Sequence, residues 1–232
     1  MFKQIRQNNL IVTFNPLIDR EKNIRTILSQ AYTVNKKFFN EDSQPIYVTF
    51  VYDRKQLDQI LHRSTFEWEV AFAYHHGDLK NQIVIFSPEV IETISKNTKS
   101  YFSYLLTHEI CHIFTDNILN FFYPRWLYEG LAGYVSKQYL KHKIIDKIVE
   151  FNLIHDKEGW ALNANYSQAY WFTKFLMDKY GEKTMIDFMK DTLNKLNRYH
   201  DFNHFQTAFN TFFKENFLDV VISWSKNNNW TR

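Results

Sequence analysis

Apolar and polar positions alternate in parts of the first half of the chain and recur with helical spacing in the second. Residues 46–52, IYVTFVY, place apolar side chains at every second position, which predicts a strand with one buried face. Shorter apolar runs predict further strands, at residues 10–14, 66–74 and 82–86. Spacing near the helical repeat predicts helices at residues 16–39, 53–61, 101–117, 124–135, 137–151, 166–180, 182–196, 202–213 and 217–226, with a polar connection at 161–165. We therefore expect an α+β fold, in which a small mixed β-sheet with helices precedes a mostly α-helical C-terminal lobe.

The helix predicted for residues 101–117 is largely apolar and contains no Gly or Pro, so we expect it to be buried. It nevertheless carries His108, Glu109 and His112 in the pattern H-E-x-x-H. Two histidines at positions i and i+4 lie one turn apart on the same face, so both imidazoles can bind one Zn²⁺ ion. The side chain of Glu109 leaves the helix about 100° further round, within reach of the proton of a metal-bound water. The alternative is a structural helix whose histidines have other partners.

A second segment, FFYPRWLYEGLAGY, supplies a candidate third ligand. Pro124 suits a first helical turn, and the apolar positions that follow predict an amphipathic helix. An antiparallel helix pair can bring Glu129 back to the two histidines, and zinc hydrolases commonly use two His, one Glu and a water. Gly130 and Gly133 fit a close helix–helix approach, since Gly is otherwise unfavourable in a helix. The alternative is an exposed helix glutamate, which the mostly apolar neighbours of Glu129 disfavour.

Three blocks in this order resemble a known family. H-E-I-C-H, then P-R-W-L-Y-E-G-L-A-G-Y, then Y-S-Q-A-Y with KFLMDKYGEKTMIDFM are similar to the gluzincin metallopeptidases, and specifically to the small peptidase MA-like proteins. The resemblance covers most of residues 46–224. It implies one zincin-like domain over residues 1–232, with a sheet-bearing region at 1–98, a helical region at 99–232, and the zinc site between them.

The resemblance also implies a function, a zinc-dependent metallopeptidase acting on a peptide or protein substrate, and a role for each candidate residue. Glu109 is the general base, and the hydroxyl of Tyr166 stabilises the oxyanion. Tyr170, one turn further along the same predicted helix, is the alternative to Tyr166. The ligands of Zn²⁺ are His108, His112 and Glu129.

The sequence alone leaves two points open. In zincins an extended substrate lies along a sheet edge, and either strand 68–74 or strand 82–86 could provide that edge. Many gluzincins also carry an acidic residue four positions after the glutamate ligand, where this chain has Gly133. Such partners matter for metal affinity. The departure leaves a catalytically inactive, zinc-binding interaction protein as the first alternative, and a metal-free helical interaction domain as the second.

Composition and charge further narrow the possible partners and the cellular location. The formal net charge is only +3 and the basic residues are scattered among acidic ones, so we expect no nucleic-acid surface. No run approaches 18 apolar residues and the N-terminus lacks the apolar core of a signal peptide, so we expect no membrane span and a cytoplasmic location. Cys111 is the single cysteine, which excludes an intramolecular disulfide and suggests a packed residue. A second histidine pair, His200 and His204, has polar flanks, so we expect no metal there.

Overall fold

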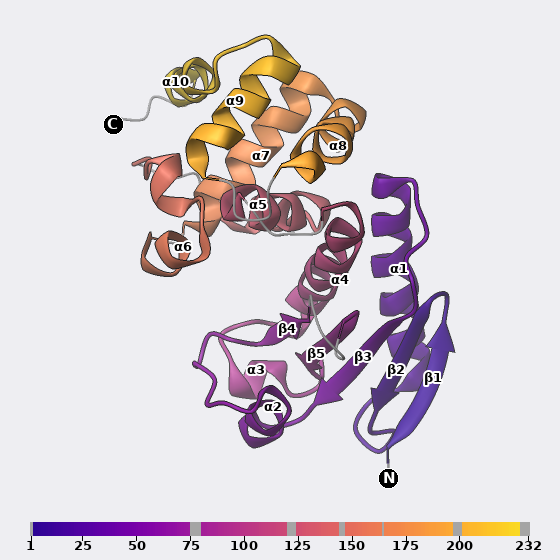
Figure 1. Cartoon of the computed structure of the whole chain (residues 1–232). Helices are drawn as coiled ribbons and strands as arrows, with labels where there is room; N and C mark the ends of the chain where they lie inside the picture. The colour runs from indigo at the N-terminus through magenta and orange to yellow at the C-terminus, as the bar shows by residue number, and fades with distance from the viewer. Residues whose placement is uncertain are drawn as a thin grey trace. The chain divides into compact units, whose positions relative to one another are not determined.

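The computed structural model describes residues 2–74, 80–119, 124–143, 147–163, 165–196 and 201–227. The chain divides into two compact units, Met1–Phe114 and Thr115–Arg232 (Figure 1). The described β-strands all lie in the first unit, and the second is built from helices, which confirms the predicted α+β class. That the two units make one domain stays a prediction.

The first unit contains a five-stranded mixed sheet in the order β1-β2-β3-β5-β4. Three strands run parallel, β2 beside β3 and β3 beside β5, and the outer strands β1 and β4 are antiparallel to their neighbours. In β3 the side chains of Ile46, Val48 and Phe50 are buried, as the alternating pattern of residues 46–52 predicts, and Val51 is buried as well. The bounds are β1 Lys3–Gln7, β2 Leu10–Phe14, β3 Ile46–Val51, β4 Ala71–Ala73 and β5 Gln82–Phe86.

The structure identifies which of the two candidate strands is a sheet edge. Strand β5 lies between β3 and β4, whereas β4 ends the sheet formed by the described residues. Phe86 N donates to Val70 O at 3.1 Å, and Tyr74 N donates to Gln82 O at 2.8 Å. Because the direction of backbone groups alternates along a strand, Ala71 and Ala73 direct their N–H and C=O groups away from β5.

Helix α4 (Phe102–Ile118), which carries the H-E-x-x-H pattern, is held in the first unit by aromatic contacts. Its Phe114 ring lies 5.7 Å from Tyr32 and 5.4 Å from Phe39, both on helix α1 (Glu21–Phe39). Phe102 meets Phe50 of β3 edge to face, with ring centroids 5.6 Å apart. Burial of such rings is the main stabilising term for an apolar helix of this kind.

The second unit has an aromatic core centred on Trp126, which is fully buried. Its ring lies between 4.9 and 5.8 Å from four phenylalanine rings, those of Phe151, Phe172, Phe205 and Phe217. These rings belong to different segments, so this one residue ties much of the unit together. The helices are α5 Arg125–Val135, α6 Lys157–Asn163, α7 Tyr166–Tyr180, α8 Glu182–Asp191, α9 Phe202–Phe213 and α10 Phe217–Asn227. None of the helices in the described ranges is long and apolar enough to cross a bilayer.

Several predicted elements need correction. The helix predicted at 137–151 is wrong, because its described residues contain only short 3-10 turns, Gln138–Lys141 and the start of Phe151–Ile154. The connection predicted at 161–165 is partly wrong, because α6 covers its first residues. Strand β1 was not predicted, strand 66–74 contracts to β4, and α1 begins at Glu21 rather than residue 16. The helix predicted at 182–196 ends at Asp191 and is followed by a 3-10 turn.

Candidate metal centre

Helix α4 presents its two histidines from one buried face. His108 is 7% and His112 5% exposed, and their ring centroids lie 4.6 Å apart. The spacing of four residues places one imidazole a single turn beyond the other. The predicted juxtaposition of the two rings is therefore confirmed.

Helix α5 carries Glu129 and packs closely against α7. A Cβ atom on Gly130 would lie 2.1 Å from Thr173 Oγ1 and 2.6 Å from the backbone oxygen of Ala169, so only glycine fits there. Glu129 itself is 4% exposed. The close contact fixes the rotation of α5 about its axis, and with it the direction in which the Glu129 side chain leaves the helix.

Gly133 is the position at which many gluzincins carry an acidic residue, and here the ring of Tyr170 fills the space. A Cβ atom on Gly133 would lie 2.1 Å from Tyr170 Cδ1. The Tyr170 hydroxyl donates to Gln138 Oε1 at 3.1 Å, and the residue is 3% exposed. An acidic side chain at position 133 is therefore incompatible with this packing, which gives a physical reason for the departure seen in the sequence.

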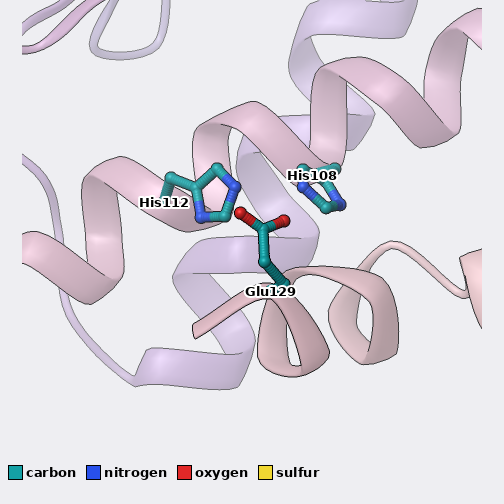
Figure 2. A group of neighbouring side chains, drawn as sticks. All are labelled: His108, His112 and Glu129. Carbon is teal, nitrogen blue, oxygen red and sulfur yellow. The ribbon is translucent and has the colours of Figure 1, made fainter. Parts of the chain in front are cut away.

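The three predicted ligands come together. One potential ligand atom from each of His108, His112 and Glu129 lies within 4.8 Å of the other two, and all three residues are buried. Figure 2 shows the Glu129 carboxylate directed toward the two imidazoles. Two imidazole nitrogens and one carboxylate oxygen form a donor set that suits Zn²⁺ and leaves a fourth position open. Within the described ranges, this group is the one set of three or more His, Cys, Asp and Glu side chains with such a geometry.

Sequence reasoning missed one charged residue of the site. Arg125 Nη2 lies 2.6 Å from Glu129 Oε1, one helical turn earlier on α5. Burial acts to lower the pKa of the Arg125 guanidinium, but the charges of Glu129 and of more distant acidic groups outweigh it and raise that pKa. The i, i+4 spacing of Arg and Glu in RWLYE was a signal that could have revealed this pair.

The remaining candidates lie as follows. Glu109 is half-buried on α4, beside His108 in sequence, and Tyr166 is the first residue of α7. The Tyr166 ring is half-buried and lies 5.1 Å from that of Trp160. Cys111 is buried, as expected for a packed residue.

The second histidine pair has a structural explanation where it is described. The Asp201 carboxylate caps α9 by accepting from His204 N at 2.9 Å, and it also contacts His204 Nδ1 at 2.8 Å. Both side chains are exposed. His200 lies outside the described residues.

Comparison with known proteins adds the family. No curated protein matches the chain. The profile of the BSP family, described as "Peptidase of plants and bacteria", matches residues 11–217, which include both halves of the His-His-Glu cluster. The match covers most of the 232 residues, and the chain therefore belongs to the BSP family of peptidases of plants and bacteria.

Proposed function

We propose that this protein is a zinc-dependent metallopeptidase of the gluzincin type, with His108, His112 and Glu129 as the zinc ligands. The observation that carries the proposal is the buried His-His-Glu cluster in a chain that belongs to a peptidase family. The donor set, two imidazoles and a carboxylate, is that of zinc hydrolases that hold a water at the fourth position.

In this proposal Glu109 carries out both proton transfers of the hydrolysis. Zn²⁺, when bound, lowers the pKa of a coordinated water toward about 7 and polarises the scissile carbonyl. Glu109 accepts a proton from the attacking water as its oxygen bonds to the carbonyl carbon. Glu109 then passes that proton to the leaving amine as the C–N bond breaks.

Tyr166 donates a hydrogen bond to the oxyanion of the tetrahedral intermediate. The packing of the alternative, Tyr170, supports this choice. Tyr170 is buried, its ring lies against Gly133, and its hydroxyl donates a hydrogen bond to Gln138 Oε1. Tyr166 is less buried and begins α7.

The substrate peptide lies extended along β4 in this proposal. Ala71 and Ala73 direct their backbone groups away from β5, so an added strand has donors and acceptors to pair with. Strand β5 is paired on both sides and offers no such edge. Of the two strands that the sequence left open as the substrate edge, the strand pairing therefore favours the first, strand 68–74.

Metal content is the first experiment. We expect about one zinc per chain in the wild-type protein and loss of zinc in His112→Ala, as for other zinc hydrolases with three protein ligands. Elemental analysis of both proteins, purified side by side and after reconstitution, checks this. Undiminished zinc in His112→Ala would refute the ligand assignment, and zinc in neither protein would favour the metal-free alternative.

Turnover distinguishes a peptidase from an inactive zinc-binding protein. Glu109→Gln keeps the shape of the side chain but cannot take the proton, so we expect it to bind zinc and to lose at least about 100-fold in kcat. A digest of a broad peptide library, followed by mass spectrometry, compares it with the wild type. Zinc-loaded wild type without any cleavage would favour the zinc-binding interaction protein.

A cytoplasmic location stays a prediction from the sequence.

A further inference from the structure

Glu129 is joined to Arg125 by an ion pair within the first turns of α5. Arg125 Nη2 lies 2.6 Å from Glu129 Oε1, and the two side chains are 24% and 5% exposed. A buried carboxylate without compensation is strongly destabilising, and a charge-assisted bond from guanidinium also fixes its direction. Because Arg125 engages Oε1, the second oxygen of the same carboxylate is the natural one to face a metal ion.

Arg125 is itself held by its surroundings. Its guanidinium carbon lies 5.2 Å from the centroid of the Tyr128 ring, and its backbone N donates to His155 O at 2.7 Å. Tyr128 is 2% exposed, and its hydroxyl donates to Asp116 Oδ1 at 3.3 Å. Asp116, at the end of α4, is itself 7% exposed.

We propose that Arg125 is a positioning residue of the metal centre, which aims the Glu129 carboxylate, and that Tyr128 and Asp116 hold Arg125 in place. This inference rests on the proposed zinc site. The acidic residue that many gluzincins carry four positions after the glutamate has no room here, because Tyr170 fills the space at Gly133. Support for the ligands therefore comes from the preceding turn of α5 rather than the following one.

Zinc affinity measured on metal-free protein tests the inference, by competition with a chromophoric chelator. Loss of such supporting contacts typically costs 10- to 100-fold in metal affinity, so we expect about that decrease for Arg125→Met. Arg125→Lys keeps the charge but not the planar fork, and should lose less. Tyr128→Phe removes only the hydroxyl donated to Asp116, and should lose least. Lys183→Met breaks an exposed ion pair of the same spacing on α8, and should bind zinc like the wild type.

A double-mutant cycle separates positioning from a general structural role. If Arg125 acts through Glu129, then Arg125→Met should have little further effect on zinc affinity in a Glu129→Gln background. A purely structural role would give additive losses and would overturn the inference, as would an Arg125→Met variant that binds zinc as tightly as wild type. If Arg125→Met does not fold, the zinc affinities of Arg125→Lys and Tyr128→Phe test the inference instead. A wild-type protein that binds no zinc would overturn the zinc site and this inference together, whereas zinc-binding wild type with unaffected variants overturns this inference alone.

Discussion

Replacing Gly133 by alanine tests the packing of the Tyr170 ring against helix α5. The added Cβ would lie 2.1 Å from Tyr170 Cδ1, where ordinary contact begins at 3.4 Å. Tyr170 is buried and hydrogen-bonded to Gln138, so its ring cannot simply turn out to solvent. Overpacking of this kind costs about 1–3 kcal/mol, while alanine gains about 1 kcal/mol over glycine in helix propensity. We expect the steric term to win and the free energy of unfolding to fall by up to about 2 kcal/mol.

Urea unfolding of the metal-free protein measures this change. The same substitution in a Tyr170→Ala background is the matched control, because the ring that blocks the Cβ is then gone. There the sign should reverse, and Gly133→Ala should stabilise by up to about 1 kcal/mol relative to Tyr170→Ala alone. Equal effects of Gly133→Ala in the two backgrounds would refute the explanation, as would a Gly133→Ala variant that is more stable than wild type.

The other predictions concern the sheet edge and a surface ion pair. Ala71→Pro removes an N–H directed away from β5, so it should weaken peptide cleavage while leaving zinc content intact. The control variant Phe72→Pro removes an N–H on the β5 side and should lower the melting temperature more than Ala71→Pro does. If Ala71→Pro cleaves peptides as fast as the wild type, the proposal that substrate binds along β4 is contradicted. The hydrogen bonds from Arg63 hold the pKa of Glu69 below its ordinary value of 4.5. The ionised Glu69 carboxylate therefore stabilises the fold fully above pH 4.5, and this stabilisation is lost as the pH falls through the lower pKa of the folded state. Glu69→Gln should therefore destabilise metal-free protein at pH 7 and have a smaller effect in acid, and an equal effect by urea unfolding at both pH values would count against this linkage.

Much of the fold could be predicted because the relevant signals are local. Helix α7 has the bounds expected from its apolar periodicity, and Gly181 ends it with a positive φ of 86°. The carboxylate of Asp53 caps helix α2 (Arg54–Leu61) by accepting from Gln56 N at 2.8 Å, as a capping aspartate should. The pairing of His108 and His112 follows from the helical repeat alone, so the central motif needed no tertiary information.

The errors arose where local propensity was weak or was overridden. Residues 137–151 have helical spacing, but Lys137 adopts a positive φ of 61° and ends the regular helix there. Strand β1 contains mostly polar residues and is exposed at most positions, so it carries no clear alternating pattern. Its pairing with β2 defines it instead.

The sequence by itself predicted which residues could bind a metal, because the potential ligands in the H-E-x-x-H pattern and in the E-G helix are recognisable by residue type and spacing. Only the tertiary structure decided that Glu129 joins the two histidines, that Tyr170 takes the space beside Gly133, and that β4 rather than β5 ends the sheet formed by the described residues. It also revealed the ion pair between Arg125 and Glu129, a residue of the candidate metal centre. Periodicity reports which face of an element is apolar, whereas these outcomes depend on which elements pack together and on the space left between them.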